Sequence, residues 1–352
     1  MKKGWVKIYE DILNDNNNLK VSIIIPCLNE ERYISQCLDS LIDNNYPKKI
    51  LEILVIDGMS EDNTRNIIKK YTIKYSYIKL IDNPKKITST AMNIGIKKAK
   101  GDIITCTNAH SVYPKNYIEK SVYWLKKLNA EVVGGIWITK PGVDTVIAKA
   151  IALVLSHPFG VGNGLFRIGI KEPVYVDTAP FAAYRKEVFN KIGLFNEKLV
   201  RNQDLEFNLR LKKAGGKILL VPDILIRYHA RPNLKGLFKE NFYNGFWVIY
   251  GIKFAKNLFS LRHLVPFFFV LSLCGSLVLS LIYRPFIYLF ILVLVSYLIL
   301  NVFFSLKISF QRGFKYFIPV MLSFTTLHFS YGFGSIGGLI KLLWEWIWKN
   351  IL

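Results

Sequence analysis

Four short polar stretches hold most of the groups that can do chemistry in the first third of the chain. They are residues 26–30, 57–62, 83–86 and 108–110, and each follows an apolar run. Together they supply carboxylates, carboxamides, lysines and one imidazole. Such groups hydrogen-bond hydroxyl and N–H groups, and histidine can also bind a metal ion.

The elements that would position these groups alternate between strand-like and helix-like segments. Strands are expected at residues 21–25, 51–56, 78–81 and 102–107, and helices at 30–43, 61–71, 88–99 and 116–128. This order predicts an α/β fold, a mostly parallel Rossmann-like sheet with helices on both faces. In such sheets ligands bind beyond the carboxyl ends of the strands, which is where the four polar stretches lie.

Several common sites are excluded by the motifs. No G-x-G-x-x-G follows the first strand and no G-x-x-x-x-G-K-[ST] occurs, so an NAD enzyme and a P-loop nucleotide site are both disfavoured. Cys27, Cys37, Cys106 and Cys274 show no C-x-x-C spacing, which argues against a disulfide framework or a zinc site.

The C-terminal part is strongly apolar. Stretches of 20, 22 and 25 residues without a charge lie between His263 and Arg284, between Arg284 and Lys307, and between Lys315 and Lys341. Roughly 20 apolar residues in a helix match the hydrocarbon core of a bilayer. About three transmembrane helices are therefore expected, with glycines in the third that would suit a bent or tightly packed segment.

The charge balance also points to a membrane. The chain has 47 Lys and Arg against 25 Asp and Glu, a net charge of +22. No nucleic-acid motif accompanies this excess, so lipid is the expected partner and nucleic acid is not. Basic residues between the second and third apolar stretches place that loop, and the first domain, on the cytoplasmic side of a multi-pass plasma-membrane protein.

Four regions are expected along the chain. They are a leader at 1–20, a catalytic domain at 21–232, an interfacial amphipathic helix at 233–262 and a transmembrane domain at 263–352. The third region is rich in lysine and aromatic residues, which is typical of a helix lying at a membrane surface. A helix packed on the sheet is the alternative.

The ordered motifs resemble those of family 2 glycosyltransferases of the GT-A fold, in particular ExoA-like enzymes of succinoglycan-type exopolysaccharide synthesis. The resemblance rests on VSIIIPCLNEE at 21–31, IDGMSED at 56–62, VDTAPF at 176–181 and LVRNQD at 199–204. It implies an inverting transferase that moves one sugar from a nucleotide-sugar. The resemblance favours a UDP-hexose as the donor. The Q-x-x-R-W motif of processive synthases is absent, which favours single-sugar transfer.

The resemblance also implies a donor site at the strand ends. Its expected residues are Pro26, Asn29, Glu30, Asp57, Lys85 and Asn108. A carboxylate such as Asp57 can accept hydrogen bonds from a nucleobase N–H or from ribose hydroxyls, although an Asp-Gly pair also makes a simple turn. Lys85 is as well explained by solvation as by phosphate binding.

A divalent cation, Mn²⁺ or Mg²⁺, is implied in the same way. Relatives carry Asp-x-Asp or Asp-Ala-His after the fourth strand, whereas this chain has Asn108, Ala109 and His110. An uncharged amide is a poor ligand for a hard cation, so His110 and the later His229 are the expected metal ligands. A structural hydrogen bond is the alternative role for each histidine.

The catalytic base implied by the resemblance is Asp204, at the start of an expected helix. Inverting transfer needs one base that deprotonates the acceptor hydroxyl as the nucleotide leaves. The alternative for Asp204 is a carboxylate that binds free backbone N–H groups at a helix N-terminus. His157 and Asp177, which precede it in the chain, are expected on the acceptor side.

Three functions stay open at this point. The first is transfer to a lipid-linked glycan in exopolysaccharide or cell-surface glycan synthesis. The second is transfer to polyprenyl phosphate itself. The third is a glycosyltransferase-like scaffold that lost activity when asparagine came to occupy position 108.

Overall fold

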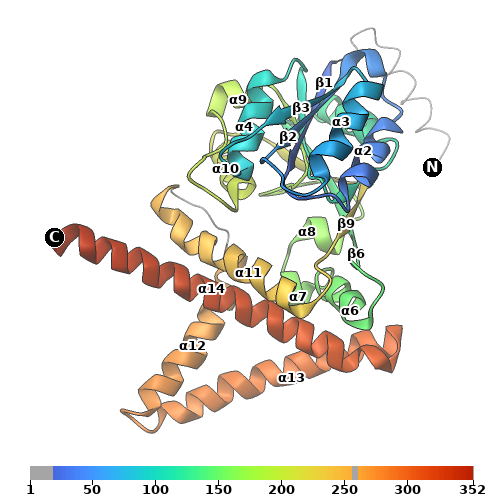
Figure 1. Cartoon of the computed structure of the whole chain (residues 1–352). Coiled ribbons are helices and arrows are strands. Elements are labelled where there is room, and N and C mark those ends of the chain that lie inside the picture. The colour runs from blue at the N-terminus through green and yellow to red at the C-terminus, as the bar shows by residue number, and fades with distance from the viewer. Residues whose placement is uncertain (1–18, 256–260, 352) are drawn as a thin grey trace. The chain divides into compact units, whose positions relative to one another are not determined.

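The computed structural model describes residues 19–255 and 261–351 (Figure 1). The chain divides into two compact units. The first holds the residues up to 138 together with 169–228, and the second holds 139–168 together with those from 229 onward. The expected leader lies almost wholly outside the described residues, as do residues 256–260 of the expected amphipathic segment.

A nine-stranded sheet forms the centre of the first unit. Its path runs β3-β2-β1-β4-β8-β6-β9-β5, and β7 pairs with β9. The strands are β1 Val21–Cys27, β2 Leu51–Asp57, β3 Ile78–Asp82, β4 Ile103–Cys106, β5 Ser111–Val112, β6 Val132–Lys140, β7 Val174–Tyr175, β8 Ala183–Arg185 and β9 Ile218–His229. The first four pair in parallel, and β8 pairs antiparallel to β4. The predicted α/β architecture is therefore confirmed.

Apolar runs explain why these strands are central. Ile23, Ile24 and Ile25 are completely buried, as expected for a parallel strand with both faces covered. The connections after β1 and β2 run towards one edge of the sheet, whereas the connection after β3 runs back. With right-handed crossovers, this reversal places α2 and α3 on one face and α4 on the other.

The helices of the first unit are α2 Ile34–Ile42, the short η1 Lys48–Ile50, α3 Thr64–Lys74, α4 Thr88–Lys98, α5 Tyr117–Lys127, α9 Glu187–Ile192 and α10 Gln203–Lys213. Five of them, α2, α3, α4, α5 and α10, lie close to their predicted positions, and η1 and α9 were not predicted. Gly95 lets α4 approach β1 closely, because a Cβ atom there would lie 2.5 Å from Ile24 Cγ2. Strand β9 continues through Pro222, since its pairing with β7 and β5 uses residues on either side of the proline.

The second unit is helical. Its elements are α6 Val146–Val154, α7 Pro158–Val161, α8 Leu165–Ile168, α11 Leu234–Tyr250, η2 Gly251–Lys253, η3 Leu261–His263, α12 Val265–Ser280, α13 Phe286–Arg312, η4 Phe314–Tyr316 and α14 Phe317–Ile351. Among the described helices, only α13 is long and apolar enough to cross a membrane, while α12 is apolar but shorter. The three predicted spans are thus not confirmed.

Candidate active site

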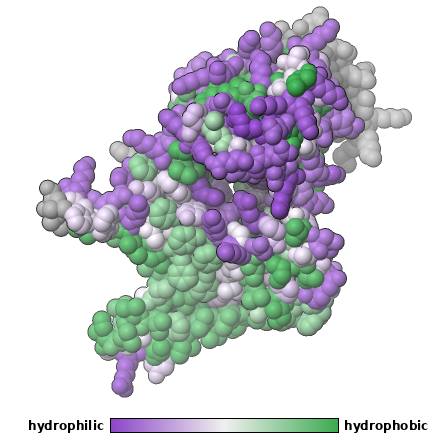
Figure 2. All heavy atoms as spheres, in the orientation of Figure 1, coloured by the Kyte–Doolittle hydropathy of each residue, from purple (hydrophilic) through white to green (hydrophobic). Residues whose placement is uncertain are grey.

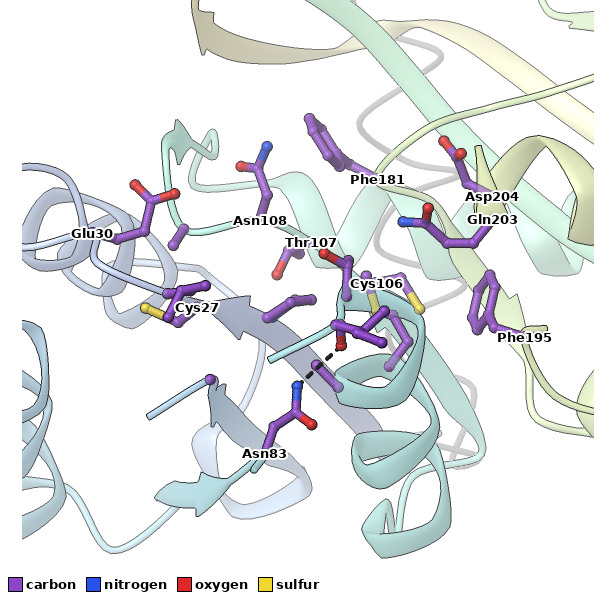
Figure 3. A pocket seen from close by; sticks show the side chains of 18 of the residues that line it. Cys27, Glu30, Asn83, Cys106, Thr107, Asn108, Phe181, Phe195, Gln203 and Asp204 are labelled. Atoms are coloured by element: carbon purple, nitrogen blue, oxygen red, sulfur yellow. Dashed lines mark hydrogen bonds between the residues drawn. The ribbon is translucent and has the colours of Figure 1, made fainter. Parts of the chain in front are cut away.

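A cavity of about 260 Å³ opens at the carboxyl ends of the parallel strands. The ends of β1 and β4, the loop after β3, the start of α4 and the start of α10 all contribute to its wall. Figure 3 shows Glu30 and Cys27 on one side of the hollow and Gln203 and Asp204 on the other, with Asn108 between them. The topology therefore brings together residues almost 180 positions apart.

Most of the predicted residues of the first unit lie in or beside this cavity. Pro26, Glu30, Asn108, His110 and Asp204 line it. The wall also includes residues that the sequence interpretation did not single out, namely Cys27, Thr107, Phe181, Tyr184, Phe195 and Gln203. The aromatic members come from outside the four polar stretches, so a prediction based on the residues that follow the strands does not include them.

Strained backbone gathers in the loops at this edge. Of the six non-glycine residues with positive φ in the described part of the chain, five lie there: Asn29, Met59, Lys86, Phe181 and Asn202. Left-handed backbone is unfavourable for side chains such as that of Phe181 and persists only where surrounding contacts enforce it. Phe181 stacks on Trp137 at 4.6 Å, and its carbonyl accepts a hydrogen bond from Tyr117 Oη. Such clustering is typical of a preorganised site.

His110 is oriented by two neighbours. Its Nδ1 lies 3.0 Å from Glu30 Oε1, and its Nε2 lies 3.2 Å from Asn108 Nδ2. A carboxylate accepts and an amide nitrogen donates, so Nδ1 carries the proton and Nε2 presents its lone pair. This is the tautomer in which a histidine binds a metal ion through Nε2.

Three carboxamide oxygens at the wall have no hydrogen-bond partner within the protein. They are Asn83 Oδ1, Asn108 Oδ1 and Gln203 Oε1, and all three are buried. Leaving such an acceptor unpaired costs roughly 1–3 kcal/mol. A ligand rich in O–H and N–H groups, such as a sugar or a nucleoside, would remove that cost.

Asp204 lies in the first turn of α10, next to Gln203. Burial raises the pKa of its carboxyl above the ordinary value, while its own backbone N–H and that of Leu205 act in the opposite direction. A raised pKa makes the carboxylate a stronger base. Glu206, two residues on, has a different role, because it forms an ion pair with Arg210.

Asp57 does not line the cavity. Its side chain is completely buried, accepts hydrogen bonds from Ser60 and lies 2.5 Å from Arg65 Nη1. Arg65 also pairs with Asp82 at 2.8 Å. This network ties the loop after β2 to β3 and to α3, so the geometry gives Asp57 a positioning role beside the site.

Asn29 and Lys85 likewise lie outside the lining. Asn29 Oδ1 accepts a hydrogen bond from the backbone N–H of Glu61, which joins the loops after β1 and β2. Lys85 forms an ion pair with Glu197 at 2.9 Å, whereas Lys86, the next residue, lines the cavity.

The two predicted acceptor-side residues, Asp177 and His157, belong to different units. Asp177 precedes Thr178, whose hydroxyl accepts a hydrogen bond from Asn208 on α10. His157 belongs to the second unit, where it caps α7 and packs edge-to-face on Phe304 and Phe324. Burial and the nearby Lys307 lower the pKa of His157.

For the predicted metal site, the structure supports only the orientation of His110. Within residues 19–255 and 261–351, no group of three or more His, Cys, Asp or Glu side chains could hold an ion. His229 ends β9 and is counted with the second unit, so its pairing with His110 stays a prediction. The Nε2 lone pair of His110 accepts from Asn108 Nδ2, so it would bind a cation such as Mn²⁺ only once that amide turned away and diphosphate oxygens completed the ligand set.

Comparison with known proteins identifies the family. Residues 22–193 match the model of glycosyl transferase family 2. A Methanococcus voltae protein, dolichyl N-acetyl-alpha-D-glucosaminyl phosphate 3-beta-D-2,3-diacetamido-2,3-dideoxy-beta-D-glucuronosyltransferase, is 30% identical over 91% of this chain and 97% of its own length. The chain belongs to glycosyl transferase family 2.

Two further likenesses agree with this glycosyltransferase family. The succinoglycan biosynthesis protein ExoA of Rhizobium meliloti is 30% identical over 68% of this chain and 70% of its own length. The mannosyltransferase PcManGT of Pyrobaculum calidifontis, solved with GDP-Man and Mn²⁺, has a TM-score of 0.60 at 15% identity and covers 97% of this chain and 94% of its own. That low identity supports the GT-A-like fold alone. The protein is an enzyme, and the resemblance seen in its motifs is confirmed.

Proposed function

We propose that this glycosyltransferase moves one sugar, with inversion, from a UDP-sugar to a lipid-linked glycan at the cytoplasmic face of the plasma membrane. The observation that carries the proposal is the cavity at the strand ends, which Asp204 lines together with the carboxamide residues Asn83, Asn108 and Gln203. Those acceptors suit sugar hydroxyl or acetamido groups, and Asp204 supplies a base beside them.

The proposed chemistry is a single displacement. Asp204 takes the proton of the acceptor hydroxyl, whose oxygen forms a bond to the anomeric carbon as the bond to the nucleotide diphosphate breaks. Attack from the face opposite the leaving group inverts the configuration. Lys86, in the loop after β3, is placed to stabilise the departing phosphates.

The acceptor class is inferred from the relatives. The name of the Methanococcus voltae protein specifies a dolichyl-linked sugar phosphate acceptor, and ExoA takes part in succinoglycan synthesis. The apolar helix α13 supports a membrane location for this chain. Multi-pass insertion in the plasma membrane is part of the same proposal.

The test is sugar transfer by the full chain in lipid nanodiscs. UDP-glucose, UDP-galactose, UDP-GlcNAc, UDP-glucuronic acid and GDP-mannose would each be offered with polyprenyl-diphosphate-GlcNAc or with polyprenyl phosphate, and products read by mass spectrometry. We expect one UDP-sugar to add a single residue to the glycan-bearing lipid. Transfer to polyprenyl phosphate but not to the glycan-bearing lipid would overturn the acceptor assignment, and transfer only from GDP-mannose would overturn the donor.

A divalent cation is the proposed cofactor, held by His110 with Asn108 beside it. When bound, it would neutralise the charge that develops on the leaving diphosphate. Glu30 is the positioning residue, because its carboxylate holds the His110 proton on Nδ1. Asn108 is uncharged and does not accept the His110 Nδ1 proton, which Glu30 holds. Its side-chain oxygen has no hydrogen-bond partner within the protein and could also face the cation.

We expect Glu30→Gln to weaken Mn²⁺ binding about 10- to 100-fold in the presence of UDP, the usual effect of removing such a supporting carboxylate. Titration of Mn²⁺ by its electron paramagnetic resonance signal measures this directly. Glu31→Gln is the matched control, since Glu31 is exposed and its side chain accepts a hydrogen bond from the Asn63 backbone N–H rather than from His110. Equal Mn²⁺ affinity for both variants would contradict the role given to Glu30.

A further inference from the structure

The longest helix, α14, has 35 residues. At about 1.5 Å per residue it is about 50 Å long, well beyond the roughly 30 Å of a hydrocarbon core. Among the described helices, α13 is long and apolar enough to cross a membrane, whereas α14 is long enough but not apolar enough. Its charged residues, Lys341, Glu345 and Lys349, lie in its last third.

Two kinds of neighbour cover α14 within the second unit. Helices α6, α7 and α11 pack on α14, and of these α11 carries several charged residues, whereas α6 and α7 are mostly apolar. The apolar pair α12 and α13 also packs on α14, with Phe304 of α13 in contact with Phe159 of α7, and Figure 1 shows α14 running between α11 and this pair. The helix therefore lies between the charged helix α11 and the apolar pair α12 and α13.

Glycines on α14 allow its backbone to pack directly against the backbone of α11. A Cβ atom on Gly334 would clash with the Phe242 carbonyl, and one on Gly338 with the Phe246 carbonyl. Tyr250, at the end of α11, then donates to Glu345 at 3.0 Å. This register shows that α11 runs parallel to α14 and accompanies it from its middle to its last third.

An ion pair marks the end of this contact. Lys253 Nζ lies 2.6 Å from Glu345 Oε2, and about half of the Lys253 side chain is exposed. Ionised groups are costly in the hydrocarbon and stay at or outside its edge. The part of α14 around Glu345 that faces the end of α11 and η2 therefore lies among headgroups or water.

The other side of the same segment is an exposed apolar stripe. It consists of Ile340, Leu343, Trp344, Ile347 and Trp348, each at least 44% exposed. Their spacing places them on one face of the helix. Tryptophan prefers the membrane interface, and Lys341 and Lys349 beside the stripe suit anionic headgroups.

The helix pair that leaves the other side of α14 is apolar on its outer surface. Leu281 and Ile282 at its tip are 85% and 83% exposed, and Tyr288 is 74% exposed. Figure 2 shows hydrophobic side chains gathered over this pair. Hydrogen bonds from Asn301 on α13 to Thr325 and to the Met321 carbonyl attach the pair to α14.

We infer that α14 lies in the plane of the membrane surface, at the level of the headgroups, and that the α12–α13 hairpin alone enters the hydrocarbon. This rests on the membrane location proposed above and replaces the expected third span by an interfacial helix. Its partner is an anionic lipid bilayer, and the stripe from Ile340 to Trp348 is the contact surface on the last third of α14.

Spin-label depth measurements test this arrangement. In a Cys274→Ala background, single cysteines would replace Ile318, Phe333, Ile340 and Trp348 on α14 and Leu292 on α13. The other cysteines are buried and should not react. The full chain would be reconstituted in phosphatidylcholine vesicles containing phosphatidylglycerol, and depth read from relaxation by oxygen and by a water-soluble nickel complex.

An in-plane helix predicts that the four α14 labels differ in depth by less than the helix diameter of about 10 Å, while the Leu292 label lies deeper. A deep label at Phe333 between two shallow ends would show that α14 spans the bilayer and would overturn the inference. Shallow labels at every position, Leu292 included, would also overturn it. Transfer to a water-soluble acceptor by the same labelled proteins reports on the proposed function separately, since it requires no membrane.

Discussion

Replacing Asp204 with Asn is expected to lower the rate of sugar transfer about 10³-fold, within the range that general-base catalysis contributes. The amide keeps the size and most hydrogen bonds of the side chain but cannot take the acceptor proton. Affinity for UDP should change little. The measurement is kcat with the best donor and acceptor, alongside UDP titration by calorimetry.

Stability should not fall in the same variant. Burial raises the folded-state pKa of Asp204, so the folded protein binds this proton more tightly than the unfolded chain. The stability from this group is therefore fully present below the unfolded pKa and is lost as pH rises through the folded value. At neutral pH the Asn variant, free of that cost, should unfold at an equal or higher Tm.

Glu206→Gln is the matched control on the same helix. Glu206 is buried and accepts two hydrogen bonds from Arg210, whose guanidinium also donates to the Ile192 and Leu194 carbonyls. Losing the charge should cost roughly 1–3 kcal/mol of stability and leave kcat nearly unchanged. If Asp204→Asn kept full activity, or if both variants lost it equally, Asp204 would not be the base.

The pH profile gives an independent check of the same assignment. The base acts as the carboxylate, so the rate falls as pH drops through its pKa. Because that pKa is raised, the acidic limb of log kcat/KM should lie above the ordinary Asp value of 3.8. Asp204→Asn should abolish this limb in the residual activity.

Replacing Arg65 with Met is expected to destabilise the protein by about 3 kcal/mol or more. Asp57 is completely buried, and Arg65, only 25% exposed, is its cationic partner. Removing one partner of a buried ion pair leaves an uncompensated charge. Urea unfolding measures the loss, and KM for the donor should rise because the loop after β2 loses its anchor beside the cavity.

Two controls separate the ion pair from general surface effects. Arg32→Met removes an exposed guanidinium nearby and should change stability by less than about 0.5 kcal/mol. Adding Asp57→Asn to the Arg65→Met variant should restore part of the stability, since the buried charge is then gone. An Arg65→Met protein as stable as the Arg32→Met protein would show that the pair contributes little.

Local sequence determined the catalytic half of the fold closely. The apolar runs at β1 and β2 are long enough only for strands and have no polar face, so they belong in the middle of a parallel sheet. Polar residues directly after each strand then identify the binding edge. This information is local, which explains why Pro26, Glu30 and Asn108, predicted at strand ends, line the cavity, while Asp204 was predicted from the family resemblance.

The tertiary structure decided the partners of those residues. Glu30 holds His110 across 80 positions, and Asp57 turns away from the cavity towards Arg65. Both outcomes depend on which side chains meet when strands pair, and neither spacing nor residue type carries that information. The same holds for Gln203, whose unpaired oxygen is apparent only once its surroundings are packed.

For the C-terminal part, the sequence by itself determined that apolar helices exist, because uncharged stretches of this length are rare outside membranes. Only the tertiary structure distinguished among them. The glycines of α14, which suit a bent or tightly packed segment, form close contacts with α11 through Gly334 and Gly338 and with α12 through Gly332, and His157 joins this helical unit. Hydropathy records the composition of a helix, whereas its place at a surface depends on which face its neighbours cover.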